Sequence, residues 1–430
     1  MEITRSKYLN DLKNRMNNGM IKVITGMRRA GKTYLLFTQF YRFLKETGIK
    51  PDAIVRLSLD DDINEEYRDA SKLSLHLRSL IKDDDVTYYL LLDEIQFAIS
   101  EEELLAPTRP MKVFSMLNGL LRLPNVDIYV TGSNSRFLSS GVLTEFRGRG
   151  DEVHILPLTF SEFMNGYDGD VYNGWAEYSL YGGLPSLLSM PTDEQKASYL
   201  SNLFKNTYRK DIISRNNIRK TQELDDLVRI LASSVGSLTN PTRIVNTFNT
   251  VLHATISVNT ILNYLDYLKD SFILSEANRY DVKGRKYIGS PNKYYFEDIG
   301  IRNSILNYRR DEENHIMENV IYNELRYRGF AVDVGIVEKR MIDNTGSNKR
   351  INYEIDFIAT QGSKKFYLQS ALALSDCEKE KQEKNSLLNI PDSFKKIIIV
   401  KDVVKTSRDD DGIVTIGLFE FLQNQNSLDL

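Results

Sequence analysis

The chain has 430 residues and a formal net charge of −3, and 41% of its residues are hydrophobic and 27% charged. This length predicts two or three domains, and this composition is typical of a soluble globular protein. The net charge excludes a protein that is strongly cationic overall, although it leaves open a local basic face of the kind that nucleic acids bind.

The cysteine and histidine content argues against disulfides and zinc sites. The single cysteine, Cys377, cannot form an internal disulfide, and the four histidines are scattered without an H-x-x-x-H pattern. The first residues carry charges throughout, so we expect no signal peptide, and no apolar run has the length that spans a bilayer. We therefore expect a cytoplasmic protein without membrane contact.

A phosphate-binding loop is predicted at residues 26–33, which read G-M-R-R-A-G-K-T. A short β-branched strand precedes it at 21–25, and apolar residues at helical spacing follow it from Tyr34. Strand, glycine loop and helix form the cradle that phosphates require, whereas a simple glycine turn would not need the full pattern. Lys32 would reach the β- and γ-phosphates, and Thr33 would hold Mg²⁺. The expected nucleotide contacts are Gly26, Arg28, Arg29, Ala30, Gly31, Lys32, Thr33 and Tyr34.

A second element of this site is predicted where an apolar run, V86-T-Y-Y-L-L-L, ends in two carboxylates, Asp93 and Glu94. Such a run is typical of a buried parallel strand. Asp93 at the end of the strand is placed to bind Mg²⁺ through water. Glu94 could polarise the attacking water as a general base. The residue pair is common by itself, but after a P-loop it points to ATP hydrolysis.

Two further segments contain candidate catalytic residues. The strand predicted at 126–131 leads into G-S-N-S, where Ser133 or Asn134 could contact the γ-phosphate or orient water, or could belong to an ordinary turn. Arg147 and Arg149, in F-R-G-R-G, could supply positive charge to the transition state, within the subunit or from a neighbour in an oligomer. Alternatively these arginines hold a turn. A strand at 53–59 and an acidic loop at 60–66 complete this region, and we assign the loop no chemistry.

These motifs resemble those of a prokaryotic family of AAA-type P-loop ATPases with a C-terminal winged-helix and restriction-endonuclease-like region. The resemblance rests on G-x-R-R-x-G-K-T, L-L-L-D-E-I-Q and T-G-S-x-S, on HILPLTFSEF from His154 to Phe163, and on YGGLP from Tyr181 to Pro185. It covers the whole chain. It implies that Lys32, Thr33, Asp93 and Glu94 take their usual roles with ATP and Mg²⁺, and that Ser133 or Asn134 matches the sensor position.

The middle of the chain predicts a basic helix followed by a winged helix. Residues 204–220 carry the basic side chains Lys205, Arg209, Lys210, Arg215, Arg219 and Lys220, which could face phosphates or an acidic surface of the same protein. Helices predicted from Leu224, Pro241 and Ser257, with a hairpin around 281–285, describe a winged helix-turn-helix. The basic wing, defined as the segment Arg279–Lys293, could contact DNA. The third helix offers no arginine for reading guanine, so a protein partner is the alternative.

The last third predicts a nuclease-like domain with missing parts. Its helix at 317–330 and its strands from 331, 352, 365 and 395 would place Glu318 or Glu324 near Asp356, with Glu354 on the same face of its strand as Asp356. On the next strand Gln369 stands where the fold's metal site needs a carboxylate, and Ala371 where it needs a lysine. Lys364 and Lys365 lie on the near side of Gln369. We therefore expect no nuclease activity, although the domain could still bind nucleic acid or a protein.

The predicted fold class is α/β: a P-loop NTPase parallel sheet with flanking helices, then a helical and winged-helix region, then an α/β nuclease-like domain. The expected domains are an AAA-type core at 1–165, a helical connector at 166–220, a winged-helix-like domain at 221–296 and a degenerate nuclease-like domain at 297–430. The function we predict is Mg²⁺-dependent ATP hydrolysis coupled to conformational change of the C-terminal domains. The alternatives are an ATP-switched DNA-binding protein with little turnover and, third, a metal-dependent nuclease.

Overall fold

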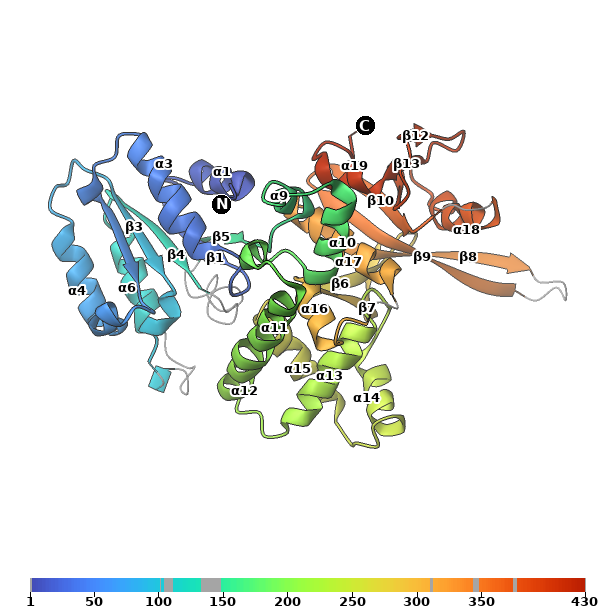
Figure 1. The fold of residues 1–430 in the computed structure, drawn as a ribbon, viewed down its shortest axis with the longest axis horizontal. Helices are drawn as coiled ribbons and strands as arrows, with labels where there is room; N and C mark the ends of the chain where they lie inside the picture. Colours follow the sequence, from blue (N-terminus) through green and yellow to red (C-terminus); the bar gives the residue numbers. More distant parts are fainter. Residues whose placement is uncertain are drawn as a thin grey trace. The chain divides into compact units, whose positions relative to one another are not determined.

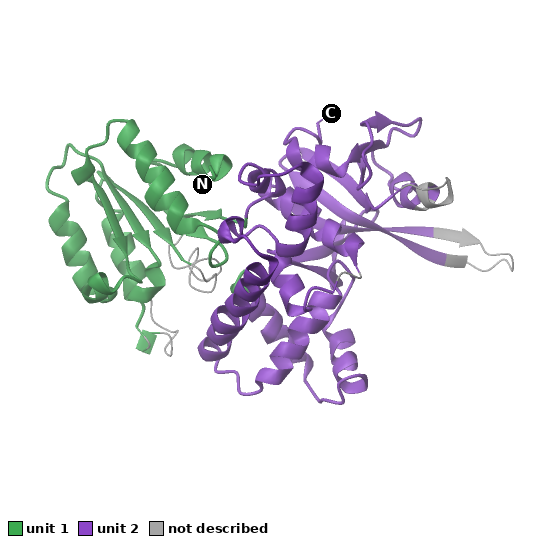
Figure 2. Cartoon of the chain, in the orientation of Figure 1, with its two compact units in different colours: residues 1–157, 270–272 green, residues 158–269, 273–430 purple. Residues whose placement is uncertain are grey.

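The computed structural model describes residues 2–100, 102–103, 111–132, 148–309, 312–342, 348–373 and 377–429 (Figure 1). The chain divides into two compact units (Figure 2). The first comprises residues 1–157 and 270–272, and the second 158–269 and 273–430. The first unit thus ends close to the boundary expected at residue 165. Within the described ranges, no helix is both long and apolar enough to span a membrane.

The first unit is built on a parallel sheet that, in its described part, has the strand order β2-β3-β4-β1-β5. Its strands are β1 (Ile21–Thr25), β2 (Ile54–Ser58), β3 (Tyr88–Asp93), β4 (Val126–Thr131) and β5 (Gly150–His154). The apolar runs predicted as buried parallel strands therefore form one sheet, as expected for a P-loop α/β fold. The order places β4 between β1 and β3. As a result, three strands end side by side at the carboxyl edge of the sheet, where α/β proteins bind ligands.

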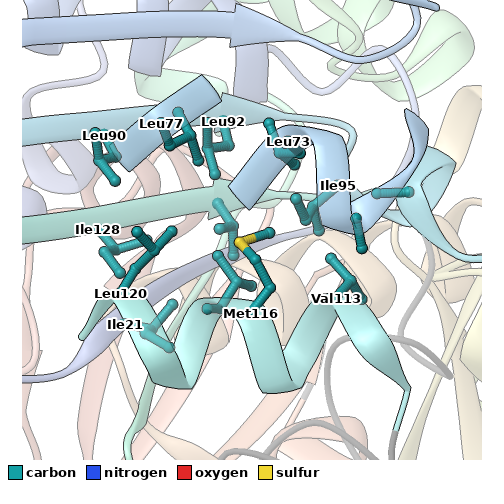
Figure 3. Packing of buried hydrophobic residues seen from close by; sticks show 14 of the residues in the cluster. Ile21, Leu73, Leu77, Leu90, Leu92, Ile95, Val113, Met116, Leu120 and Ile128 are labelled. Carbon is teal, nitrogen blue, oxygen red and sulfur yellow. The ribbon is translucent and has the colours of Figure 1, made fainter. Parts of the chain in front are cut away.

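Helices cover the sheet of the first unit. They are α1 (Ser6–Asn14), a continuous helix made of α2 (Lys32–Tyr34), η1 (Leu35–Phe40) and α3 (Tyr41–Glu46), then α4 (Ala70–Leu80) and α6 (Lys112–Leu120). Figure 3 shows Leu73 and Leu77 of α4, with Met116 and Leu120 of α6, packed against side chains of the strands. In each helix the two residues are four positions apart, which places them on one apolar face toward the sheet. This core fixes the strand ends that carry the site.

The second unit begins with helices. They are α9 (Phe160–Met164), α10 (Val171–Tyr181), α11 (Asp193–Leu203), η6 (Phe204–Arg209) and α12 (Lys210–Arg215), followed by α13 (Thr221–Ser233), α14 (Pro241–Thr250) and α15 (Val258–Asp270). The three helices expected from 224 onward are thus present as α13, α14 and α15. The hairpin expected after them is also present, as β6 (Leu274–Asp281) and β7 (Lys286–Phe296).

The hairpin does not stand apart as a free wing, because it belongs to the large mixed sheet of the second unit. In the described residues this sheet has the order β12-β13-β11-β10-β9-β8-β6-β7, and β6 pairs with β8 in parallel. The other strands are β8 (Ala331–Ile342), β9 (Asn348–Gln361), β10 (Lys364–Ala371), β11 (Lys395–Val400), β12 (Ser407–Arg408) and β13 (Val414–Gly417). The boundary expected near residue 297 therefore falls inside one sheet. Helices α16 (Ile299–Ile305), α17 (Glu313–Tyr327), α18 (Cys377–Leu388) and α19 (Leu418–Gln423) accompany these strands.

The two junction motifs have a packing role within the second unit. The backbone N–H of Leu158 donates to the carbonyl of Gly183 (2.8 Å), and the N–H of Gly183 donates to the buried carboxylate of Asp298 (2.9 Å). A Cβ on Gly183 would lie 2.2 Å from the carbonyl oxygen of Leu158, so only glycine fits there. Thr159 and Glu162 form a capping box at the start of α9. The YGGLP and LTFSEF stretches thus join segments distant in sequence.

Candidate nucleotide site

The predicted phosphate loop connects β1 to α2, and its backbone takes the left-handed conformations that such a loop requires. The φ angles are 133° at Gly26, 67° at Arg29 and 97° at Gly31. A Cβ on Gly26 would lie 2.2 Å from the carbonyl oxygen of Ile155, so this position needs glycine. Lys32 is buried, and its ammonium donates to the carbonyls of Gly26 and Met27, both at 3.0 Å. The side chain of Lys32 therefore lies across the loop in which we expect the phosphates to bind.

A buried arginine near the start of the chain braces this loop. Arg5 donates to the carbonyl of Ala30 (2.9 Å) inside the loop and to the carbonyl of Leu156 (2.7 Å) beyond β5. A guanidinium can bridge two separate backbone segments because its donors form a rigid fork. Arg5 was not predicted as part of the site, because no sequence motif around it indicates that it lies near the loop.

The ends of α2, β3 and β4 bring the predicted magnesium ligands together. The hydroxyl of Thr33 donates to Oδ2 of Asp93 at 2.9 Å, although the two residues are 60 apart in sequence. The hydroxyl of Thr131, at the end of β4, donates to Oδ1 of the same carboxylate. Burial raises the pKa of Asp93, while the hydrogen bonds from Thr131 and Thr33 oppose the rise. The hydroxyl of Ser58, at the end of β2, also donates to Oδ2 (3.3 Å), so hydroxyls from three other elements hold Asp93 at the carboxyl edge of the sheet.

Glu94 is placed by the same threonine. Its backbone N–H donates to the hydroxyl oxygen of Thr131 at 2.9 Å, so one hydroxyl accepts from Glu94 and donates to Asp93. Glu94 has a φ of 52°, which is uncommon for a residue with a side chain and places it in a tight turn directly after β3. Its carboxylate contacts the side-chain amide of Gln96. Thr131 and Gln96 are therefore supporting residues that the sequence analysis missed.

The residues present fit a nucleotide with Mg²⁺. The loop offers a backbone with three positive φ angles, the buried ammonium of Lys32 and the start of a helix, which together suit phosphates. The hydroxyl of Thr33 and the carboxylate of Asp93 are the oxygen ligands that Mg²⁺ prefers, and they already lie within hydrogen-bond distance of one another. Arg28, Arg29 and Ala30 are part of the loop, and Tyr34, which follows it, is 40% exposed.

Four further catalytic candidates were predicted: Ser133, Asn134, Arg147 and Arg149. Ser133, Asn134 and Arg147 lie outside the described residues. Arg149 is exposed, and its carbonyl accepts from the N–H of Ile21 at 2.8 Å. Ile21 begins β1 and the loop follows its last residue, so Arg149 lies at the opposite end of this strand from the loop. A role for Arg149 within its own subunit has no geometric support, whereas a role in a neighbouring subunit stays a prediction.

Another polar cluster lies directly beside the loop and was not predicted. The buried hydroxyl of Thr25, the last residue of β1, donates to Glu152 (2.7 Å) and lies 3.0 Å from Nδ1 of His154. Both partners come from β5, which pairs with β1 in parallel. Alternation along β5 puts Glu152 and His154 on one face, and this is the sequence signal that could have identified them.

Several basic side chains of the middle region form ion pairs within the second unit. In residues 204–220, Arg209 binds Asp225 through two nitrogens (2.6 and 2.9 Å), Arg215 lies 3.7 Å from Asp211, and Lys220 binds Glu223 (2.7 Å). This supports an intramolecular role for that helix. In the basic wing, Lys283, Arg285 and Lys286 are exposed. Lys293 is fully buried, so the prediction that it could contact DNA is wrong.

Lys293 instead lies among three carboxylates, which we call the carboxylate centre: Glu318, Glu354 and Asp356. Its ammonium is 2.8 Å from Glu318, 2.7 Å from Glu354 and 3.4 Å from Asp356. Burial alone would lower the pKa of Lys293, but the three carboxylates outweigh burial and raise it, so the side chain is charged. The expectation that Glu354 and Asp356 share a face of β9 is confirmed.

The other nuclease-like positions lie as follows. Glu324 forms an ion pair with Arg328 (2.8 Å), whereas Glu318 contacts Lys293, which also contacts Asp356. Glu318 is therefore the helix glutamate near Asp356. The side-chain oxygen of Gln369 accepts from the backbone N–H of Asp356 at 3.3 Å, and Ala371 is buried. Lys364 and Lys365 lie near Asp429 and Asp392, respectively. The basic side chain at the carboxylate centre therefore comes from β7, outside the segment where a lysine was sought.

The buried carboxyl of Glu318 predicts a specific pH dependence of stability. Burial raises the pKa of Glu318 to about 7, compared with its ordinary value of 4.5. The ammonium of Lys293 and the hydroxyl of Tyr295 (2.6 Å) oppose this rise. Asp356 and His315 are the other charged or titratable neighbours of Glu318. The folded state then binds a proton that the unfolded state releases. The free energy of unfolding should fall between pH 4.5 and 7, by up to about 3 kcal/mol.

Urea unfolding of the wild type and of Glu318→Gln at several pH values measures this contribution. The amide stays neutral, so we expect the stability of the variant relative to the wild type to increase from pH 4.5 to pH 7. Parallel pH profiles for the two proteins would contradict the assignment.

Comparison with known proteins gives the following matches. A family model described as an AAA domain matches residues 18–164, and one described as a domain of unknown function (DUF8612) matches residues 172–312. An uncharacterized protein of Haemophilus influenzae is 31% identical over 425 residues, 98% of each chain. An uncharacterized protein of Methanocaldococcus jannaschii is 28% identical over 400 residues, 88% of this chain and 81% of that one. The structure of AMPPCP-bound DnaA from Aquifex aeolicus matches at a TM-score of 0.30 and 16% identity, covering 61% of this chain and 86% of DnaA.

Proposed function

Since this chain belongs to one family with the uncharacterized Haemophilus influenzae protein and contains an AAA domain, we propose that it is an ATP-binding P-loop protein that hydrolyses ATP with Mg²⁺. One observation carries the proposal. The hydrogen bond between Thr33 and Asp93 joins the two magnesium ligands predicted from separate motifs. Neither motif alone would establish such a site.

The phosphate loop does the binding in this proposal. Its left-handed residues Gly26, Arg29 and Gly31 turn backbone N–H groups toward the phosphates, and the start of α2 adds positive potential. Lys32 is already desolvated. Moving its ammonium from two neutral loop carbonyls to phosphate oxygens would give hydrogen bonds in which donor and acceptor are both charged.

In the hydrolysis step of this proposal, Asp93 binds the metal, Glu94 is the general base and Thr131 positions both residues. Thr33 and Asp93 would hold Mg²⁺, which would neutralise charge on the phosphates when bound. Glu94 would accept a proton from the attacking water; its backbone N–H is held by Thr131 and its carboxylate contacts the amide of Gln96. Thr131 sets the spacing of the two carboxylates because its hydroxyl contacts both residues. Arg147 or Arg149 would complete a neighbouring subunit's site in an oligomer.

We propose that the cycle changes the conformation of the second unit and so controls what that unit binds. DNA is one candidate partner, because Lys283, Arg285 and Lys286 are exposed together at the turn between β6 and β7. Phosphate contacts of this kind carry no sequence information and weaken steeply with salt. A protein partner is the alternative.

Steady-state ATP hydrolysis by the purified full-length protein tests the proposal. We expect turnover with Mg²⁺ and none after chelation with EDTA. The same assay with double-stranded DNA at low and high salt distinguishes the partners. Stimulation by DNA that fades with salt supports the basic turn, and a basal rate indifferent to DNA points to a protein partner. Absence of both nucleotide binding and hydrolysis would overturn the proposal.

A further inference from the structure

Strands β8 and β9 continue beyond the rest of their sheet as a two-stranded arm. β6 pairs with β8 only as far as Ile336, and β10 pairs with β9 only from Phe357 onward. The β8–β9 ladder runs on past both points, and Figure 1 shows the two strands leaving the sheet together. Among the described residues, no third strand pairs with residues 338–342 or 348–352, which we call the β-arm.

The β-arm is strongly basic. It has one acidic residue, Glu338, and its basic residues are Lys339, Arg340, Lys349 and Arg350. The side chain of Arg350 is 67% exposed and lies 3.7 Å from that of Glu338. Lys339 is partly exposed, and it forms no ion pair with another described residue. Charged side chains on free edge strands keep copies of a protein from pairing, but charges of either sign serve that purpose. An excess of one sign indicates an anionic partner.

The basic turn between β6 and β7 lies at the base of this arm. The ammonium of Lys283 donates to the backbone carbonyl of Glu338 at 2.7 Å, which joins the turn to β8. A carbonyl does not neutralise an ammonium, so Lys283 adds its charge to that of the β-arm. Arg285 and Lys286 are exposed, and neither forms an ion pair within the described part of the chain. Turn and arm therefore form one continuous basic surface, although they come from segments more than fifty residues apart.

We propose that this surface binds double-stranded DNA, with the β-arm in the major groove and the basic turn on the flanking phosphates. The inference deepens the proposed function by naming duplex DNA as the partner of the second unit, and it rests on that function only for the coupling to ATP.

The shape of the β-arm favours duplex DNA over other polyanions. A two-stranded ribbon fits the major groove of B-DNA, which is about 12 Å wide. Five residues at about 3.3 Å each give the arm a reach of roughly 16 Å, enough to lie within the groove. The major groove of A-form RNA is deep and too narrow for side chains to read. Single strands are held by stacking on aromatic rings, and the sequence of the β-arm contains no aromatic residue.

Fluorescence anisotropy with the nucleotide-free, full-length protein and a labelled duplex of about 30 base pairs, roughly three helical turns, tests the proposal. The double variant Lys339→Ala/Arg350→Ala should bind about tenfold more weakly or worse. Its slope of log affinity against log salt should be smaller by about 2, because each phosphate contact contributes about 0.9. The matched control is Lys405→Ala/Arg408→Ala, which removes an exposed lysine and arginine at or near β12, at the other end of the sheet. The control should bind DNA like the wild type.

Several results would overturn the proposal. One is a wild-type protein that binds no duplex at low salt, and another is an alanine variant with wild-type affinity and slope. Tighter binding of single-stranded DNA or of polyglutamate than of the duplex would assign the surface to that class of partner instead. The charge-conserving swap Lys339→Arg/Arg350→Lys should bind like the wild type, and loss of DNA binding by this variant in its folded state would count against phosphate contacts. If the alanine variant does not melt cooperatively, Arg350→Ala alone gives the same test with a slope change of about 1.

Lys32→Ala separates this inference from the proposed ATPase. Without nucleotide, that variant should bind the duplex like the wild type while losing hydrolysis. A protein that binds DNA through the β-arm but neither binds nor hydrolyses ATP would overturn the proposed function and leave this inference standing. An active ATPase whose β-arm variants bind DNA like the wild type would do the reverse.

Discussion

Replacing Glu94 by glutamine should lower steady-state ATP hydrolysis by about 10²–10⁴-fold, the usual contribution of a general base, and leave ATP affinity nearly unchanged. The amide has the shape of the carboxylate but cannot accept the proton of the attacking water. Glutamine should not disturb the backbone, because the N–H bond from residue 94 to Thr131 does not involve the side chain, and a glutamine oxygen can still accept from the amide of Gln96. Titration calorimetry with ATP and a phosphate-release assay measure the two quantities on one protein preparation.

Glu65→Gln is the matched control for this variant. Glu65 is an exposed glutamate in the 3₁₀ segment Asp62–Arg68, part of the acidic run to which we assign no chemistry, and its amide variant should hydrolyse ATP at the wild-type rate. Undiminished hydrolysis by Glu94→Gln would show that another group activates the water. Glu152, which Thr25 holds beside the phosphate loop, would then be the first carboxylate to test.

The sequence alone indicated that Thr33 and Asp93 belong to one candidate site, because the determinants of that site are local. A glycine loop between a strand and a helix, and two carboxylates after an apolar run, each carry a physical requirement within a few residues. Parallel strands present their carboxyl ends at one edge, so finding Asp93 near Thr33 needed no knowledge of strand order. Thr131 and Arg5 were missed because their roles depend on which strand lies between β1 and β3 and on contacts across more than a hundred residues.

The second unit was harder to predict because its organisation depends on long-range pairing. The β6–β7 hairpin reads locally as a wing, yet Arg279 to Asp281 pair with Val334 to Ile336 and draw the hairpin into a larger sheet. Lys293 was counted as an exposed basic residue, since lysines are rarely buried. Its burial depends on carboxylates from α17 and β9, which no local pattern around residue 293 reveals. Alternation along β9 did correctly place Glu354 and Asp356 on one face.

Replacing Lys32 by alanine should weaken ATP binding by at least about tenfold and reduce hydrolysis by about 10²–10³-fold. The affinity loss corresponds to hydrogen bonds with charged phosphates, at about 1.5–3 kcal/mol. The additional loss of rate reflects charge stabilisation that is strongest in the transition state. The buried position of Lys32 makes these effects larger than for an exposed lysine, because little water screens its charge.

Lys45→Ala controls for the loss of a lysine from the same continuous helix. Lys45 is exposed in the last turn of α3, so its removal should change neither affinity nor rate. The patterns of the two site variants are distinct: Lys32→Ala should lose binding and turnover together, whereas Glu94→Gln should lose turnover alone. Wild-type affinity in Lys32→Ala would mean that the ammonium stays on the carbonyls of Gly26 and Met27 when nucleotide binds. Its role would then be to shape the loop rather than to hold phosphate, and the backbone N–H groups alone would provide the binding site.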